Sequence, residues 1–338
     1  MNWKLLALPV SVIPFLIIAV TFNVSLANLL AIGIIPFVAA ALVMACKLLT
    51  QGLKFNYLVK KFLGPVDVNW KTISVRIGSE FVTSTTPSFV GGELVRIMWL
   101  NKKGIAVGKA SWVTIIEIVT EVLVAGSFAI TAAVISFVYG AYVIGIAILA
   151  VSIPVTGVWS TLFFLSSKRT FQVPKWASRI AIRVGKERSM NYIDKTNLWM
   201  TEICDMSRQT LHDKKIKKAF VVSIIISVFT WSLYGLSFMI IASGAGYTID
   251  FFHSLMATMA SNAIGNLPVT IGGSGLTEFS IWAYLGHLNT LTFVAAKNSL
   301  QWNIVIAWRI ATYHVGLVIS WLFLMKIVYP SIKSTKTA

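Results

Sequence analysis

Long apolar runs alternate with short polar or basic connections along almost the whole chain. About 20 helical residues cross the roughly 30 Å of hydrocarbon in a bilayer, so runs of this length predict membrane-spanning helices. The pattern predicts six of them, over residues 3–22, 29–49, 110–138, 142–165, 219–242 and 299–329. We therefore expect an all-α, polytopic integral membrane protein.

Two other apolar segments are interrupted by a proline and a glycine pair. Residues 87–92 and 268–273 both read Pro-x-x-x-Gly-Gly, and a glutamate follows each of them, Glu93 and Glu278. The two prolines stand 181 positions apart. One such interruption is typical of a kinked helix, whereas two matching ones predict a duplicated structural element with a function.

Composition and charge set the class and the topology. The chain has 338 residues, of which 57% are hydrophobic and 12% charged, and its net charge is +17. A soluble domain carries about 25% charged residues, so the basic excess is interpreted through the positive-inside rule. Basic residues on both flanks of the first interrupted segment predict two cytoplasmic connections; these residues are Lys47, Lys54, Lys60, Lys61 and Lys71 before it, and Arg96, Lys102, Lys103 and Lys109 after it.

A segment with two cytoplasmic flanks cannot cross the membrane once, so residues 73–100 are predicted to enter and return as a re-entrant hairpin. The second interrupted segment, about 250–290, lies in a stretch poor in lysine and arginine and is predicted to enter from outside. Similar hairpins entering from opposite sides predict an inverted repeat with a substrate site near the midplane. Both chain termini are predicted to be cytoplasmic.

The predicted organisation is one transmembrane domain over 1–338, with a first half 1–165 and a second half 219–330. Between them, residues 168–218 form a basic cytoplasmic loop. Trp176, Ile180 and Val184 recur there at every fourth position among basic residues. This spacing fits an amphipathic helix on an anionic leaflet. A solvated basic loop that serves only as a topology signal fits equally well.

The interruptions have a chemical consequence. Non-helical backbone inside a bilayer leaves N–H and C=O groups unsatisfied unless protein or a wet cavity surrounds them. Glycine permits the sharp turn, and the half-helices after Gly92 and Gly275 would present free N–H groups and a positive dipole end, which together form an anion site. The alternative is that the glycine pairs only let helices pack closely.

Several ionisable residues lie inside apolar runs, where a charge costs roughly 2.5 kcal/mol or more; they are Glu93, Glu117, Glu121, Glu278 and Arg309. Glu117 and Glu121 share one helix face because they are four residues apart. We expect Arg309 to pair with one of the acids or to bind a phosphate through its two-pronged guanidinium; a purely structural ion pair is the alternative. Arg76 and Glu80 are expected near the membrane interface and carry less weight.

Enzymatic motifs are absent from the sequence. No Gly-x-x-x-x-Gly-Lys-Ser/Thr phosphate loop occurs, and residues 272–276 fail as a nucleophile elbow because Leu276 replaces the second glycine. No His-Glu-x-x-His or acid-rich metal motif occurs either, and Cys46 and Cys204 are isolated. We expect a protein that is not an enzyme and that needs no metal and no cofactor.

Three motifs resemble one known family: Thr86-Pro87-Ser88-x-x-Gly91-Gly92-Glu93-x-x-Arg96, Leu267-Pro268-x-x-x-Gly272-Gly273-x-Gly275-x-x-Glu278 and Arg309-x-x-x-Tyr313. They are similar to the flippase-like transmembrane domain of bacterial lysylphosphatidylglycerol synthases and of many stand-alone bacterial and archaeal proteins, some linked to polyprenol-based glycosylation. The resemblance covers nearly the whole chain. It departs from the family at Ile118, where the family's Glu-Arg-x-x-Asp pattern has arginine.

The resemblance implies lipid movement, and because no soluble aminoacyl-transferase domain is expected after the last span, it does not imply lipid synthesis. We expect a flippase in the cell membrane that moves an anionic or phosphate-linked lipid between leaflets. This lipid would be a phospholipid, an aminoacyl-phospholipid or a polyprenyl-phosphate-linked glycolipid. Membrane lipids are the expected partners, nucleic acid is not, and a homodimer is compatible with the sequence. Two alternatives stay open: a secondary transporter of a small soluble metabolite, and a non-transporting subunit of a lipid-linked glycosylation system.

The predicted substrate-binding residues come from the two interruptions and the acidic and last spans. Arg309 and the half-helix N-termini are expected to bind phosphate, and the glutamates to bind cationic or hydroxyl groups or to carry a coupling proton. The full set is Pro87, Gly91, Gly92, Glu93, Arg96, Glu117, Glu121, Pro268, Gly272, Gly273, Gly275, Glu278, Arg309 and Tyr313.

Overall fold

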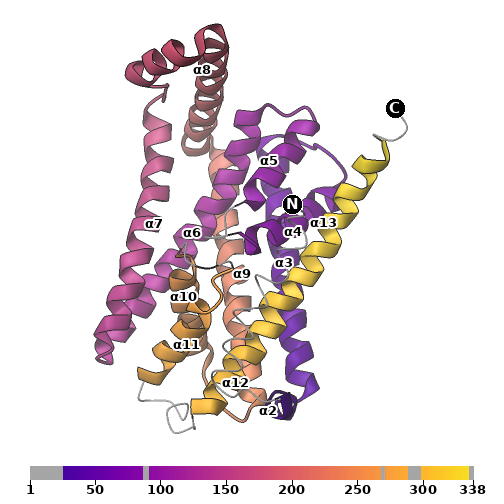
Figure 1. The fold of residues 1–338 in the computed structure, drawn as a ribbon, viewed down its shortest axis with the longest axis vertical. Helices are drawn as coiled ribbons and strands as arrows, with labels where there is room; N and C mark the ends of the chain where they lie inside the picture. Colours follow the sequence, from indigo (N-terminus) through magenta and orange to yellow (C-terminus); the bar gives the residue numbers. More distant parts are fainter. Residues whose placement is uncertain (1–25, 87–90, 268–269, 271, 288–297, 335–338) are drawn as a thin grey trace.

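The computed structural model describes the chain except residues 1–25, 87–90, 268–269, 271, 288–297 and 335–338. Helix is the only regular structure in the described part (Figure 1). Five stretches of it are long and apolar enough to cross a membrane: α3 (Ile34–Phe62), α6 (Val107–Val138), α7 (Tyr142–Lys168), α9 (Lys214–Gly244) and Gln301–Ile327. The chain is therefore a multi-pass membrane protein. The predicted span over 3–22 lies outside the described residues.

Helices α6, α7 and α9 agree with the predicted spans to within a few residues, but α3 does not. It was expected to end at Leu49 and continues to Phe62. Lys47 and Lys54, interpreted from the sequence as loop charges, lie inside this helix with exposed fractions of 6% and 0%. That interpretation was wrong, because the groups that surround both lysines come from other helices: Lys54 pairs with Glu121 of α6, and Lys47 lies against Trp231 and Tyr234 of α9. Lys60 in the last turn of α3 is exposed.

The two interrupted segments are pairs of short helices. The first hairpin consists of α4 (Asn69–Ser84) and α5 (Gly92–Lys102), and the second of α10 (Phe251–Gly265) and α11 (Leu276–His287). The two helices of each hairpin pack against one another. Their interhelical tips include residues outside the described part, Pro87 and Pro268 among them.

The bases of the two hairpins lie at opposite ends of the bundle (Figure 1). The first base follows the end of α3 and precedes α6, and Asp67 joins its two sides through an ion pair of 2.6 Å to Lys103. The second base follows Gly244, whose Cα hydrogen faces Pro36 near the start of α3; a methyl group there would come within 2.4 Å of Pro36. The two tips therefore approach one another from opposite directions.

The apolar run 299–329 predicted one uniform helix for the last span, but the structure divides it into three parts. Helix α12 (Asn298–Arg309) is followed by a π-helical turn, η1 (Ile310–His314), and then by α13 (Val315–Ser334). α13 packs closely along α4 at Gly78, where a methyl group would lie 2.9 Å from the Leu324 amide nitrogen. The π turn thus lies beside the first hairpin.

Residues 168–218 are largely helical. Helix α8 (Lys175–His212) lies at one end of the bundle (Figure 1), and a short helix, α2 (Leu26–Ala31), lies at the other. The Trp199 indole N–H donates to the Ser111 hydroxyl at 3.0 Å, which joins α8 to α6. Trp176 and Ile180 are exposed. The helical alternative for this segment is confirmed, and contact with an anionic leaflet stays a prediction.

Two apolar clusters hold the hairpins in place. The larger one lies where α6, α9, α10 and α12 meet and buries Ala132, Phe238, Met256 and Trp308. The other lies under the base of the first hairpin and buries Phe55, Leu100, Trp112 and Val113. Because such cores are close-packed, small shifts of the hairpins are costly. The packed helices of both hairpins are thereby held in place.

At Gly92 the two helices of the first hairpin approach one another so closely that no side chain fits between them. A methyl group there would lie 2.1 Å from the Thr83 hydroxyl oxygen and 2.5 Å from the Ser79 carbonyl oxygen. We expect Gly92→Ala to destabilise the protein by roughly 1–3 kcal/mol, the usual cost of overpacking, seen as a lower melting temperature in detergent. Gly157→Ala on α7 is the control because its methyl group meets nothing within 4 Å. Equal melting temperatures for the two variants would contradict this packing.

Asp67 gives the base of the first hairpin a pH dependence. The hydrogen bond from Lys103, followed by one from the Val68 N–H, lowers the pKa of the Asp67 carboxyl to about 2. A lowered acid pKa stabilises the folded state above the unfolded pKa of about 4, and this contribution is lost as pH falls further. We expect Asp67→Asn to lower the melting temperature at neutral pH. The difference in melting temperature between the variant and wild type should disappear between about pH 4 and pH 2. A difference that does not change with pH would show that the negative charge of Asp67 does not stabilise the fold.

Candidate functional site

The π turn η1 connects the tips of both hairpins. The Tyr313 hydroxyl donates to the Ser84 carbonyl oxygen at 2.9 Å, at the end of α4. One turn earlier, Arg309 Nη2 donates to the Gly272 carbonyl oxygen at 2.7 Å. Side chains of the last span thus donate hydrogen bonds to two backbone carbonyls that lie at or beyond a helix end. Backbone polar groups inside a membrane require such partners.

Glycine is required at position 272 for two reasons. Its φ is +61°, in the left-handed region that other residues avoid. A methyl group there would also lie 2.0 Å from the Tyr313 hydroxyl and 2.8 Å from the Ser84 carbonyl oxygen. The second tip therefore touches both the last span and the end of the first hairpin's α4.

Each hairpin caps its own second helix with the predicted glutamate. Glu93 Oε2 accepts a hydrogen bond from the Gly91 N–H at 2.7 Å, and Glu278 Oε2 accepts one from the Gly275 N–H, also at 2.7 Å. A carboxylate is favourable at a helix N-terminus. The anion position expected for a phosphate is therefore already taken by a carboxylate in both halves.

Glu117 on α6 is the centre of a buried ion network. Arg76 Nε of α4 and Arg96 Nη1 of α5 both donate to its carboxylate, which is 1% exposed. Arg76 also pairs with Glu80 at 2.7 Å, and Arg96 with Glu93 at 3.3 Å. The network ties both arms of the first hairpin to α6.

Glu121, one turn further along α6, is held by α3. Lys54 Nζ lies 2.7 Å from its carboxylate and also donates to the Ser227 hydroxyl of α9 at 3.0 Å. The Gln51 side-chain amide donates to the same carboxylate at 3.3 Å. Three spans are thereby joined at one acid.

Arg309 pairs with Glu278 at 2.7 Å, and both are almost fully buried. Its guanidinium lies 4.2 Å from the centre of the Tyr313 ring. The prediction that Arg309 pairs with one of the acids is confirmed. The cap of the second hairpin and the last span are joined by this pair.

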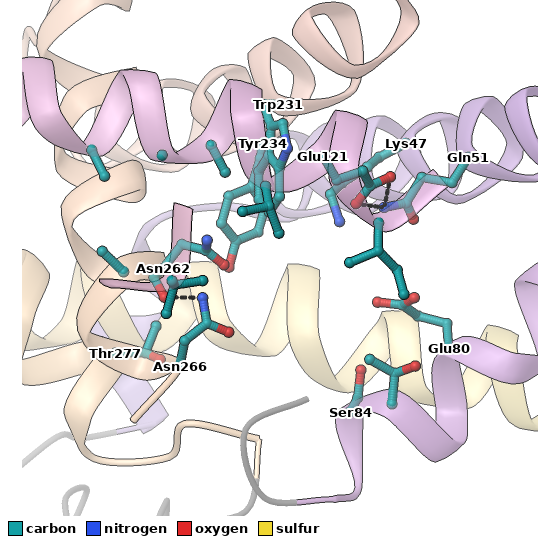
Figure 2. A pocket seen from close by; sticks show the side chains of 18 of the residues that line it. Lys47, Gln51, Glu80, Ser84, Glu121, Trp231, Tyr234, Asn262, Asn266 and Thr277 are labelled. Carbon is teal, nitrogen blue, oxygen red and sulfur yellow. Dashed lines mark hydrogen bonds between the residues drawn. The ribbon is translucent and has the colours of Figure 1, made fainter. Parts of the chain in front are cut away.

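These groups surround a cavity of about 620 Å³ between the hairpins. Figure 2 shows Lys47, Gln51 and Glu121 on one side, Glu80 and Ser84 below them, and Asn262, Asn266 and Thr277 opposite; Trp231 and Tyr234 stand between the two sides. Helices α6 and α7 contribute a largely apolar part of the remaining lining, as at Val122, Ala125, Val151, Val155 and Trp159. The cavity therefore combines a polar floor with an apolar flank.

The structure gathers most of the predicted site residues. Cavity-lining positions are Glu93, Arg96, Glu117, Glu121, Arg309 and Tyr313, and Glu278 lies directly behind Arg309. Gly91, Gly92, Gly272, Gly273 and Gly275 form the described parts of the tips, and Pro87 and Pro268 lie outside the described residues. Arg96 was predicted both as a site residue and as part of a basic cytoplasmic flank; it is 3% exposed and lines the cavity.

Sequence reasoning missed one wall of the cavity. Lys47, Gln51 and Lys54 follow the i, i+4, i+7 spacing of one helix face, a signal that was set aside when α3 was ended at Leu49. Arg76 and Glu80 also line the cavity instead of lying at the interface. The arginine that the acidic motif lacks at Ile118 is replaced from elsewhere, because Arg76 and Arg96 reach Glu117.

The fold and the cavity define a multi-pass membrane protein with a charged internal site. Comparison with known proteins gives the family: the profile of the lysylphosphatidylglycerol synthase TM region matches residues 5–327. The chain belongs to this family. It is also 24% identical over 264 residues to a UPF0104 membrane protein of Archaeoglobus fulgidus, an alignment that covers 77% of each chain. No solved structure matches the chain.

Glu117 should dominate the stability of the site. Breaking a buried ion pair by removing one partner costs roughly 3–5 kcal/mol, and Glu117→Ala leaves two arginines short of a partner. We expect a large fall in melting temperature in detergent. Asp205→Ala is the control, since its pair with Arg208 on α8 is exposed and such pairs contribute about 0–1 kcal/mol. A similar small effect for both would exclude a structural role for the network.

Proposed function

We propose that this protein is a lipid flippase that moves an anionic or phosphate-linked lipid between the leaflets of the cell membrane. The charge-lined cavity between two hairpin tips supports this most directly. A polar headgroup needs such a cavity, because moving it through hydrocarbon would leave its polar groups unsatisfied. Family membership is compatible with this activity but does not define it, and the protein would act without catalysing a reaction.

The two hairpins would be re-entrant and related as an inverted repeat. Their helices have 16 and 11 residues in the first and 15 and 12 in the second. At 1.5 Å per residue these are about 16–24 Å long, too short for a bilayer core of roughly 30 Å. Each would enter from one side, turn near the midplane and return. The matched Glu93 and Glu278 caps support descent of both from one ancestral unit.

A lipid flippase and a transporter of soluble metabolites differ in where the cavity opens: a flippase needs an opening toward the bilayer. Val155 of α7 lines the cavity and is 38% exposed. Its neighbours on α7, Ile153 and Val158, are exposed and apolar, as a lipid-facing surface is. We place the acyl or isoprenoid chains on this side, with the headgroup inside. A transporter of soluble metabolites would need instead a route closed to the bilayer.

The orientation follows from the basic end of the bundle. Lys60, Lys61 and Lys102 lie at the end that carries α8, and α13 ends there as well (Figure 1). By the positive-inside rule this end would be cytoplasmic. Helix α8 would then lie on the anionic inner leaflet and raise the local concentration of anionic lipid. The predicted cytoplasmic N-terminus belongs to the part of the chain that the structure leaves undescribed.

Arg309 provides the first functional test. In reconstituted vesicles, wild type should move fluorescent phosphatidylglycerol or a polyprenyl phosphate probe faster than empty vesicles. Arg309→Ala should lose this activity, because it removes a cavity cation and leaves buried Glu278 unpaired. Arg208→Ala, an exposed position on α8, should keep wild-type rates.

A second variant separates function from folding. Arg309→Gln combined with Glu278→Gln removes both charges without leaving one unpaired, so it should fold and still fail to move lipid. Movement at the wild-type rate in this double variant would exclude Arg309 from the transport path. No movement of any lipid by folded wild type would favour the metabolite transporter or the non-transporting subunit.

A further inference from the structure

We infer that Lys47 is the primary anchor for the phosphate oxyanion of the transported headgroup. This inference rests on the proposed function for the statement that the phosphate is carried by a lipid. Its structural basis is independent of transport: Lys47 lines the cavity, and among the described residues no carboxylate oxygen lies within 4.0 Å of its ammonium group.

The other cations around the cavity are already engaged. Lys54 binds Glu121, Arg309 binds Glu278, and Arg76 and Arg96 share Glu117. A phosphate could reach any of these only in competition with a buried carboxylate, whose loss of its partner costs several kcal/mol. Lys47 is only 6% exposed and forms no ion pair within 4.0 Å in the described part of the chain, and the carboxylates of Glu80 and Glu121 act on it only from farther away.

Two aromatic rings hold Lys47 without neutralising it. Its Nζ lies 5.4 Å from the centre of the Trp231 ring and 5.2 Å from that of Tyr234. Cation–π contacts of this kind attract a lysine ammonium group without providing a counter-ion. They position it but leave its N–H donors for a ligand, and a lysine ammonium is a common point-charge partner for phosphate.

The surroundings of Lys47 favour a phosphate ester with a polar substituent. Gln51 lies one turn further along the same helix, and its side-chain oxygen is buried without a hydrogen-bond partner. Across the cavity, Asn262 and Asn266 of α10 present amide groups (Figure 2). Amides recognise hydroxyl groups in either hydrogen-bonding role. The carboxylates of the cavity are all paired, so a headgroup with positive charge alone gains little there.

The first experiment measures binding, independently of transport. Purified wild type, Lys47→Met and Lys60→Met are titrated in detergent with inorganic phosphate and with sn-glycerol 3-phosphate, by calorimetry. Lys60 is the matched control because it lies exposed on the same helix. We expect Lys47→Met to bind roughly tenfold or more weakly, the usual effect of losing a charge-assisted hydrogen bond, and Lys60→Met to bind like wild type. Equal binding by all three proteins would overturn the inference.

The second experiment asks whether the phosphate belongs to a lipid. Vesicles of phosphatidylcholine carry a tracer of fluorescent phosphatidylglycerol or of a fluorescent neutral glycolipid without phosphate. Lys47→Met should slow phosphatidylglycerol roughly tenfold or more while Lys60→Met matches wild type. If Lys47→Met moves phosphatidylglycerol at the wild-type rate, Lys47 is not the phosphate anchor, and the proposal that the protein is a flippase still stands. If wild type moves no lipid but binds phosphate through Lys47, the anchor stands and the ligand is a soluble anion.

A stability measurement separates an anchor from a structural cation. Removing a buried cation that has no ion-pair partner relieves its desolvation cost, so Lys47→Met should melt no lower than wild type in the absence of phosphate. It should also lose the rise in melting temperature that phosphate gives wild type, because a ligand stabilises only the state that binds it. A clear destabilisation of Lys47→Met with an intact response to phosphate would assign Lys47 a structural role and overturn the inference.

Discussion

The pairing of buried charge is the constraint on which the rest of this structure depends. Burying an ionised group within an apolar bundle is costly unless it has a partner, and here Glu117, Glu121 and Glu278 take their partners from other helices. Glu117 joins both arms of the first hairpin to α6, while Glu121 joins α3 to α6. Each pair is therefore also a tertiary contact that fixes where a helix can lie. The polar cavity and the rigidity of its walls have the same origin.

The last span, which contains the π turn, is hydrogen-bonded to both halves of the protein. A π turn widens a helix by one residue and is often found at functional sites. In this protein it places Arg309 and Tyr313 so that one reaches the second tip and the other the end of α4. Movement of either hairpin would have to break a hydrogen bond with the last span or carry that span along. The two tips and η1 therefore form one mechanical unit at the centre of the bundle.

Much of the helical framework could be predicted from the sequence, because long apolar runs have few alternatives to spanning helices. The bounds of α6, α7 and α9 and the places of both hairpins follow from such runs and from the proline–glycine interruptions. The polar wall could not be predicted in the same way. Lys54 meets Glu121 across 67 positions, and Arg76 meets Glu117 across 41. Partners so distant leave no local signal, so Lys54 resembled a loop charge and Arg76 resembled a residue at the membrane interface. The π turn was missed because its residues are ordinary helix formers.

The two glutamate caps differ in how far along the chain their counter-charges lie. Glu93 has Arg96 three residues away, within its own short helix, whereas Glu278 is paired by Arg309 after a further 31 residues. During synthesis the first hairpin therefore brings its own neutralising charge into the bilayer. The second carries an uncompensated acid until the last span has been made and has docked. Biogenesis of this protein thus has a late step, in which the final helix supplies the counter-charge for the cap of the second hairpin.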